Sequence, residues 1–306
     1  MGALEAAILT VITAATPLLF AAIGELVTER SGVLNLGLEG MMAVGAVTGF
    51  AVALSTGNDS AGVLAAALAG MVLAALFAAL TLRLATSQVA TGLALTLLGL
   101  GLSGLIGEAF VGKSRPPLPK LHVPGLSDLP LVGRVLFGQD VLVYLSFALV
   151  IGVSYVLWRT RAGLVLRAVG DSHGSAHALG YPVLRIRFLA TLFGGACAGL
   201  GGAFLSLVYT PHWSEAMTAG RGWIALALVV FASWIPWRAM LGAYLFGAVT
   251  ILQFYAQGAG VGVPSQFLSS LPYLATILVL VVTARDRLAH ARNAPACLGQ
   301  PFVAER

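Results

Sequence analysis

The sequence predicts an all-α membrane protein, a polytopic helix bundle of about nine transmembrane spans, within a range of eight to ten. Of its 306 residues, 58% are hydrophobic and only 9% are charged, and the mean hydropathy is +0.94. Soluble domains carry roughly 25% charged residues, so this composition excludes a soluble fold. Apolar runs of the length that crosses a bilayer also recur along the whole chain.

The apolar runs are expected to form spans in chain order. They lie near 3–24, 34–54, 62–82, 89–111, 140–158, 188–209, 223–236, 239–257 and 271–284. The seventh run is short, and the eighth ends in the Gly-rich segment 257–262, so a tenth span or a re-entrant segment stays open. No polar stretch is long enough for a soluble domain. We therefore expect one transmembrane domain, residues 1–290, followed by a cytoplasmic tail, residues 291–306.

The positions of the arginines predict the orientation of the bundle. A formal net charge of +5 would suggest nucleic-acid binding in a soluble protein, but here the arginines lie at helix ends, and we exclude that partner. The loop 159–187 holds five arginines against the single acid Asp171. With this loop in the cytoplasm most arginines lie inside, the N-terminus outside and the C-terminus inside. The start of the chain carries Glu5 and no basic residue, which predicts an uncleaved first span.

The loop 159–187 connects two expected spans and is expected to contain a short helix. Ser172–Leu179 is rich in small residues, and Gly180 and Tyr181 precede Pro182, which cannot continue a helix. A helix tethered in this way to two spans can transmit force between the membrane domain and a protein docked on it. A solvated basic loop that only sets the topology explains the same composition.

Rows of small residues predict close contacts between helices. Gly99, Ser103 and Gly107 form one row, and Gly195 and Gly199 form another. Because lipid offers no hydrophobic drive between helices, close approach of their backbones holds such bundles together. We interpret both rows as structural.

Polar residues inside the second expected span are the main candidates for a pathway. Asn35 and Glu39 are four residues apart and share a face if the segment is helical. A buried carboxylate is costly unless it is paired, protonated or hydrated. These residues, with Met42, either line a polar pathway or hydrogen-bond a neighbouring helix and fix its packing. Gly32, Gly37 and Gly40 would allow a local opening of the backbone, which is tolerated beside water or protein.

Several patterns that suggest chemistry fail on their context. Gly107–Ser114 fits the phosphate-binding loop pattern, but a span precedes it instead of a strand, and three prolines in the next five residues forbid the required helix. His173 and His177 have metal-like spacing but no third ligand, and Cys197 and Cys297 have no partner at metal-ligand spacing. No catalytic arrangement is present, so we expect neither an enzyme nor a cofactor or metal.

The segment Gly32–Ala46, GVLNLGLEGMMAVGA, resembles the membrane permease subunits of bacterial ABC importers, above all the simple sugar and nucleoside uptake branch. That branch carries the signature N-L-G-[LV]-E-G-M-M, which residues 35–42 match. The resemblance runs along nearly the whole chain. The loop by which the family contacts its ATPase is similar here at Arg167, Gly170, Ala176, Ala178 and Gly180. The helix from His173 onward is less charged than in many relatives, and Leu38-Glu39 favours nucleosides over branched-chain amino acids.

The resemblance implies a multi-pass protein of the bacterial inner membrane that moves a small polar solute, most of all a nucleoside, by alternating access. It implies a second permease subunit in a heterodimer, cytoplasmic ATPase subunits that hydrolyse the ATP, and an external substrate-binding lipoprotein. It places ATPase coupling at the five loop residues named above. A branched-chain amino acid or sugar ABC permease stays an alternative, as does an ion-coupled secondary transporter that uses Glu39.

Overall fold

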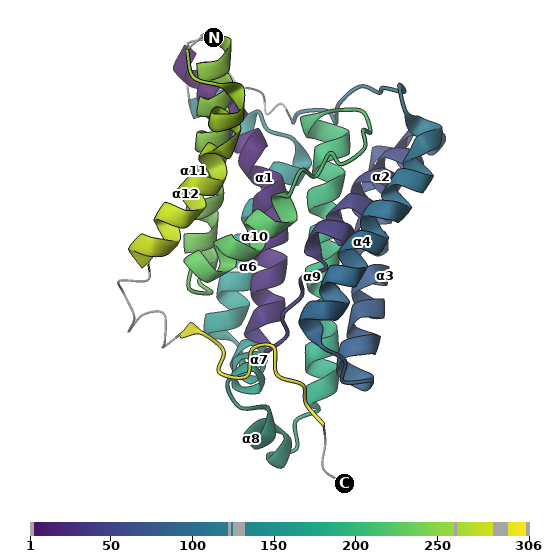
Figure 1. Cartoon of the computed structure of the whole chain (residues 1–306), viewed down its shortest axis with the longest axis vertical. Coiled ribbons are helices and arrows are strands. Elements are labelled where there is room, and N and C mark those ends of the chain that lie inside the picture. Colours follow the sequence, from purple (N-terminus) through teal and green to yellow (C-terminus); the bar gives the residue numbers. More distant parts are fainter. Residues whose placement is uncertain (1–2, 122–123, 125–131, 260–261, 284–292, 304–306) are drawn as a thin grey trace.

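The computed structural model describes residues 3–121, 124, 132–259, 262–283 and 293–303, which form a bundle of helices (Figure 1). The helices are α1 (Ala3–Arg30), α2 (Leu38–Thr56), α3 (Asp59–Ala78), α4 (Gln88–Gly107), α5 (Val132–Phe137), α6 (Val141–Arg159), α7 (Arg161–Asp171), α8 (His173–Ala178), α9 (Val183–Phe204), α10 (Arg221–Phe231), α11 (Pro236–Gly258) and α12 (Ser265–Thr283). π-helical turns extend α3 to Arg83 and α9 to Tyr209, and a 3-10 turn extends α4 to Phe110.

Among the described residues, seven helices are long and apolar enough to cross a membrane, which confirms the predicted all-α polytopic bundle. The predicted seventh span, 223–236, corresponds to α10, which has only 11 residues. At a rise of 1.5 Å per residue such a helix measures about 16 Å, well short of the ~30 Å hydrocarbon core. The segment is therefore a partial helix inside the bundle, and the predicted count of about nine is approximate.

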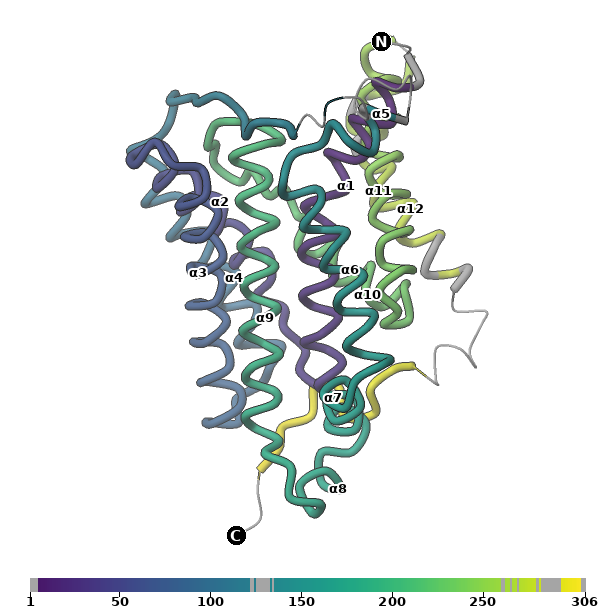
Figure 2. The backbone as a smooth tube through the Cα atoms, turned by 180° about the vertical axis from the view of Figure 1, so that it is seen from behind, coloured from purple at the N-terminus to yellow at the C-terminus, as the bar shows by residue number. Residues whose placement is uncertain are grey.

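Two long helices, α1 and α9, lie side by side at the centre of the bundle (Figure 1). α2 and α3 pack against α9, and α4 packs against α2. α6, α10 and α11 pack against α1 on the other side. Figure 2 shows from behind that α9 separates the α2–α4 group from α6 and α11. The central pair therefore joins the two halves of the bundle.

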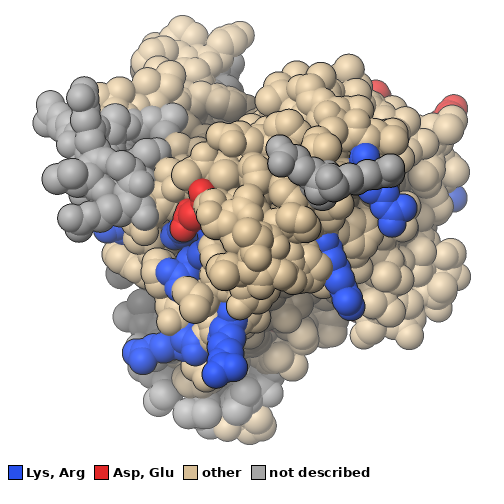
Figure 3. Space-filling view, turned by 90° about the horizontal axis from the view of Figure 1, so that it is seen from below, with Lys and Arg blue, Asp and Glu red and all other residues tan. Residues whose placement is uncertain are grey.

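The ends of the bundle differ in composition. The N-terminus lies at one end, which we call the N-terminal end, and α7, α8 and the segment 293–303 lie at the other, the α7–α8 end (Figures 1 and 2). Figure 3 views the α7–α8 end, where basic side chains outnumber acidic ones. The predicted short helix is confirmed as α8, and its cap Ser172 accepts a hydrogen bond from the amide of Ser175 at 3.3 Å. The loop 159–187 contains a second helix, α7, and α9 begins at Val183, earlier than predicted.

The predicted rows of small residues form close helix contacts. A Cβ built on Gly199 of α9 would lie 2.1 Å from the carbonyl oxygen of Ala66 in α3, and one on Gly195 would lie 2.3 Å from the Cβ of Ala74. In the other row, a Cβ on Gly99 would lie 2.6 Å from a backbone atom of α2. Real Cβ atoms do not come this close to backbone, so the packing of α9 on α3 and of α4 on α2 requires glycine.

Replacement of Gly199 by alanine tests this packing. We expect Gly199→Ala to lower the thermal unfolding midpoint of the purified protein, because overpacking of this kind costs about 1–3 kcal/mol. The matched control is Gly152→Ala in α6, where an added Cβ meets nothing within 4 Å. There the better helix propensity of alanine should leave the midpoint unchanged or raise it. Equal midpoints for the two variants would contradict the close packing of α9 on α3.

Candidate functional site

The chain between α1 and α2 is not helical, although it lies inside the bundle. α1 ends at Arg30, Gly32 has a φ of +89°, and α2 begins at Leu38. Residues with a side chain rarely adopt this φ, so glycine permits the turn. The predicted local opening of the backbone is found between Arg30 and Leu38, whereas Gly40 lies within α2. We call residues 31–37 the α1–α2 break.

Side chains of two helices satisfy backbone groups of the break. The amide of Leu34 donates to Oε1 of Gln88 in α4 at 2.8 Å, and the amide of Asn35 donates to Oε1 of Glu25 in α1 at 3.0 Å. The hydroxyl of Thr96 in α4 donates to the carbonyl of Leu36 at 2.9 Å. Non-helical backbone at membrane depth is stable only where protein or water supplies such partners. Polar residues of α1 and α4 therefore hold the break in place.

Glu39, in the first turn of α2, caps the N-terminus of α10. The residue is 4% exposed, its Oε1 accepts a hydrogen bond from the amide of Gly220 at 2.8 Å, and its Oε2 accepts one from the amide of Gly222 at 2.5 Å. The first amides of a helix lack partners within the helix and lie at the positive end of its dipole, so a carboxylate stabilises them. A Cβ on Gly222 would lie 2.6 Å from the Cα of Glu39. This geometry favours the interpretation in which Glu39 fixes a neighbouring helix.

Residues at the end of α1 hold the other end of α10. Arg30 is 4% exposed, and its Nε and Nη2 donate to the carbonyl of Trp234, just beyond α10, at 3.3 and 3.1 Å. The indole N–H of Trp234 donates to Oε2 of Glu29 at 2.6 Å. A cation near the C-terminus of a helix and an anion at its N-terminus both interact favourably with its dipole. α10 is thus held between the two sides of the α1–α2 break.

The residues predicted to line a pathway are all buried. Asn35 lies outside α2, and its Oδ1 accepts a hydrogen bond from the amide of Gly37 at 3.0 Å. The expectation that Asn35 and Glu39 share a helix face is therefore wrong, because the break takes the place of a first helical turn. Met42 is fully buried in the main apolar core, and a Cβ on Gly202 of α9 would lie 2.0 Å from its carbonyl oxygen. The assignment of these residues to a pathway stays a prediction.

Two further buried acids, Glu25 and Glu29 of α1, are easily overlooked in the sequence because they end a long apolar run. Glu25 is 0% and Glu29 is 1% exposed. They are four residues apart and so share a face of the helix. Two acids four residues apart within an apolar run would have identified this pair in the sequence, because a carboxylate inside a membrane span needs a partner.

The residues predicted to contact an ATPase lie at the α7–α8 end in two environments. Ala178 and Gly180 are exposed at the end of α8, and Gly180 has a φ of +85°. Ala176 is 2% exposed, and Gly170 is buried against α1, where a Cβ would lie 2.2 Å from a backbone carbonyl oxygen. The guanidinium of Arg167 stacks on the ring of Trp158 in α6, 4.5 Å from its centroid. Only Ala178 and Gly180 therefore lie where a docked protein can touch them without displacing packed groups.

The segment 293–303 crosses the α7–α8 end and is bonded to α7 and to the break. The amide of Cys297 donates to the carbonyl of Gly170 at 2.9 Å, and the amide of Gly299 donates to the carbonyl of Gly32 at 3.1 Å. Figure 1 shows this segment passing below the end of α1 and in front of α7. The described part of the tail thus packs against α7 and the break and forms part of the α7–α8 end.

Arg187, near the start of α9, joins this segment to α8 and to the break. The side chain is fully buried; its Nε donates to the carbonyl of Ser31 at 3.1 Å and its Nη1 to the carbonyl of Gln300 at 2.9 Å. Its Nη2 lies 3.2 Å from Nδ1 of His173, whose ring centroid is 5.2 Å from that of Phe302. One guanidinium therefore contacts both the first residue of α8 and the α1–α2 break.

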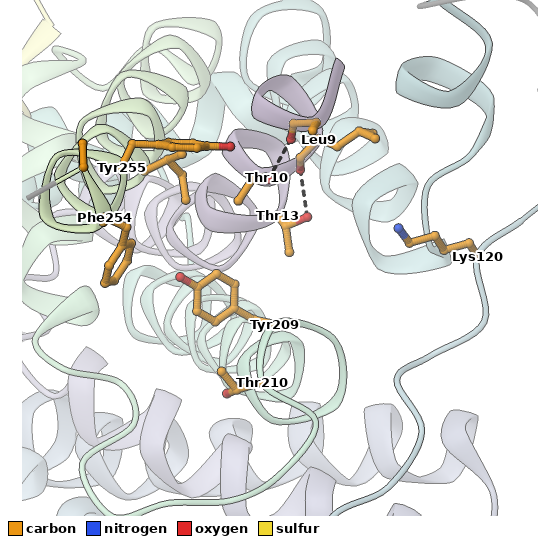
Figure 4. A pocket seen from close by; sticks show the side chains of 12 residues that line it. Leu9, Thr10, Thr13, Lys120, Tyr209, Thr210, Phe254 and Tyr255 are labelled. Atoms are coloured by element: carbon orange, nitrogen blue, oxygen red, sulfur yellow. Dashed lines mark hydrogen bonds between the residues drawn. The ribbon is translucent and has the colours of Figure 1, made fainter. Parts of the chain in front are cut away.

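At the N-terminal end an open cavity of about 910 Å³ lies between the start of α1, the end of α9 and the end of α11. Figure 4 shows aromatic rings and threonine hydroxyls around it, with Lys120 reaching in from the segment before α5. The lining residues are Ala6, Leu9, Thr10, Thr13, Lys120, Tyr209, Thr210, Ile251, Phe254, Tyr255, Gly258 and Ala259. None of the predicted pathway residues is among them.

A family model for the branched-chain amino acid transport system / permease component matches residues 7–283. The chain belongs to this permease family. The permease is 44% identical over 291 residues to the putative glucose ABC transporter permease protein TsgC13 of Haloferax volcanii, with 88% of each chain covered. It is 32% identical over 280 residues to the nucleoside ABC transporter permease protein NupC of Lactococcus lactis, covering 87% of this chain and 88% of the relative. The guanosine ABC transporter permease protein NupQ of Bacillus subtilis is 30% identical over 306 residues, covering 94% and 93%.

These matches confirm that the permease is a multi-pass membrane protein and a component of an ABC transporter, of a family that is not itself catalytic. No solved structure is significantly similar to it. The matched region ends at residue 283. The docked segment 293–303 therefore lies outside the part of the chain that the family model matches.

Removal of the carboxylate of Glu39 tests its role as a cap. We expect Glu39→Ala to lower the thermal unfolding midpoint strongly, because two buried amides lose a charged acceptor and each such hydrogen bond contributes about 1.5–3 kcal/mol. Glu39→Gln, which keeps one acceptor oxygen, should fall between the alanine variant and the parent. The control is Glu108→Gln on the exposed turn after α4. A Glu39→Ala midpoint equal to that of the control would contradict the capping role.

The pH dependence of stability tests the contact of His173 with Arg187. Burial, and then the positive charge of Arg187, lowers the pKa of His173 from its ordinary value of 6.5. The folded protein therefore binds fewer protons at this site than the unfolded chain as the pH falls below about 6.5, and stability decreases there. We expect the unfolding midpoint of the parent to drop more between about pH 7.5 and 5.5 than that of His173→Gln. His212→Gln, at the opposite end, should keep the parental drop, and an unchanged drop in His173→Gln would refute the assignment.

Proposed function

We propose that the permease is the translocating subunit of an ABC importer and that its solute is a nucleoside. Two of its full-length relatives are named for nucleosides or guanosine, and the signature at residues 35–42 supports the same branch. A monosaccharide is the second candidate, because the relative with 44% identity is named as a putative glucose permease. A branched-chain amino acid is less well supported, since the relative named for these solutes, the probable LivH of Methanocaldococcus jannaschii, is 27% identical and aligns with only 47% of this chain.

The observation that carries the proposal is the projecting α7–α8 end. α8 extends beyond the bundle (Figure 1), and the residues that follow it include Leu179, 78% exposed, and Tyr181, 40% exposed. Apolar side chains exposed on a basic surface are suited to a protein partner. We propose that this end faces the cytoplasm and docks a separate ATPase subunit. The phosphate-loop pattern Gly107–Ser114 begins at the last residue of α4, and no helix starts at its Lys113 and Ser114, so its structure does not support a nucleotide site there.

The α1–α2 break and the partial helix α10 supply the element that moves. Discontinuous helices near the middle of the membrane typically form the sites around which transporters undergo alternating access. Pressure on α8 would reach the break through His173, Arg187 and the carbonyl of Ser31. Asn35 and Glu39 would then act at an inner gate rather than as a wall of an open pore. A second permease subunit would complete the pathway, and an external binding lipoprotein would deliver the solute.

The ion-coupled alternative is less well supported, because the carboxylate that motivated it already accepts two backbone hydrogen bonds. Uptake of guanosine or glucose by vesicles that contain only this chain and no ATP would establish the alternative. The ABC importer requires that such vesicles take up neither solute, and that uptake appears when the ATPase, the second permease and the binding protein are added with ATP.

A charge placed on the exposed end of α8 tests the docking surface. We expect Leu179→Asp to abolish co-purification of the ATPase subunit and to reduce ATP-dependent uptake at least tenfold. The thermal midpoint of the isolated permease should not change, because Leu179 makes little contact within the chain. The control is Val111→Asp, a residue of similar exposure, 66%, at the opposite end.

Replacement of Leu179 is a sharper probe than replacement of Gly180 or Arg167. Any side chain at Gly180 is strained at its φ of +85°, and loss of Arg167 breaks its stacking on α6. Normal ATPase binding by Leu179→Asp would place the docking surface elsewhere, whereas equal loss in Val111→Asp would show a general defect of assembly.

A further inference from the structure

The cavity at the N-terminal end has the chemistry of a solute site. Thr10 and Thr13 of α1 line it, and their hydroxyls donate to the carbonyls of Ala6 and Leu9 at 2.7 and 2.9 Å. The donor of each hydroxyl is thus used, while lone pairs of its oxygen remain free to accept. A ligand with O–H or N–H donors fits these two threonine oxygens, while Lys120 and the hydroxyls of Tyr209 and Tyr255 can donate to its acceptors.

Aromatic rings supply the second requirement, a flat apolar surface. Tyr209, Phe254 and Tyr255 line the cavity, and the last two are 51% and 56% exposed. The guanidinium of Arg221 lies 5.2 Å from the ring centroid of Tyr209, which holds that ring in place. In Figure 4 the rings of α11 and Tyr209 lie on one side of the cavity and Lys120 on the other. A planar base or the apolar face of a sugar can stack on rings placed in this way.

The charge of the described lining favours a neutral solute. Lys120 is the one charged residue in its described lining, and no carboxylate is present there. The ammonium group of an amino acid would find no carboxylate in the described lining, and a phosphate would find one lysine but no arginine for bidentate recognition. The volume, about 910 Å³, lies within the range of small-molecule sites, roughly 300–1,000 Å³.

We propose that this cavity is a binding site for the solute on the side where it enters, and that it takes a neutral hydroxylated ring compound. Nucleosides and monosaccharides share this chemistry. The inference rests on the proposed function for the direction of transport, but occupancy of the cavity is a property of the permease itself. Binding here would select the solute a second time, after any external binding protein.

The test is protection of an engineered cysteine in the assembled importer. Thr13→Cys is made in a Cys297→Ser background, and Cys197, which is 2% exposed, is left in place. A membrane-impermeant maleimide should label Thr13→Cys, and guanosine or glucose should slow the labelling several-fold while leucine does not. The relative protection by guanosine and glucose distinguishes the two solutes. Thr250→Cys is the control, because this α11 threonine also bonds a carbonyl four residues earlier but does not line the cavity.

Transport by a second variant keeps the proposal testable if the cysteine variant does not fold. Thr10→Val with Thr13→Val should lower the kcat/KM for uptake on the order of tenfold, the loss expected for one or two hydrogen bonds. Thr250→Val should retain parental uptake. Protection of the Thr13→Cys variant by a ring solute without any ATP-dependent uptake would contradict the proposed function but still support the binding site. Parental uptake by the double variant, equal protection by leucine, or no protection by either ring solute would overturn the site.

Discussion

The hydrogen bonds from the backbone of α10 to the carboxylate of Glu39 are the constraint on which the interior of this permease depends. A helix of 11 residues cannot cross the bilayer, so its first amides lie within the protein and need an acceptor there. Glu39 supplies one at 2.8 and 2.5 Å. Neutral acceptors would satisfy the same amides, but a carboxylate also compensates the positive end of the helix dipole. The charge of Glu39 is thus compensated by the helix that it caps.

The opposite end of α10 completes the arrangement. The guanidinium of Arg30 donates twice to the carbonyl of Trp234, while Glu29 accepts a hydrogen bond from the indole N–H. Both groups come from the last turn of α1, and Glu39 comes from the first turn of α2. The eleven residues from Glu29 to Glu39 therefore hold a helix that lies nearly two hundred residues away in the sequence. Arg187 then fixes the same stretch to α8 through Ser31 and His173.

Much of the fold follows from the sequence, because apolar runs and small-residue rows depend on local composition. The nine predicted apolar segments all contain helices, and the close contacts at Gly99 and Gly199 lie where the rows place them. Composition cannot tell a span from a partial helix such as α10, whose length is set by the turn at Gly220 and the residues after Phe231. The same limit applies to the α1–α2 break: Gly32 and Gly37 indicate that it can open, but not that Asn35 lies outside the helix.

The site was less predictable than the fold, because its partners are distant in sequence. Glu39 can be recognised as a costly buried acid, yet nothing local identifies Gly220 and Gly222 as its donors. Arg187 looks like one more loop arginine, although it is fully buried and bonded to three segments. The cavity at the N-terminal end combines residues of α1, α9 and α11 that carry no motif at all.

Hydrogen exchange at the start of α10 tests the central claim most directly. In the parent protein the amides of Gly220 and Gly222 should exchange slowly, because each donates to a buried carboxylate. In Glu39→Ala a peptide spanning 218–224 should lose most of this protection, while peptides of α9 keep theirs. Unchanged protection of 218–224 in Glu39→Ala would show that α10 does not depend on Glu39 for its stability, and would contradict the capping role.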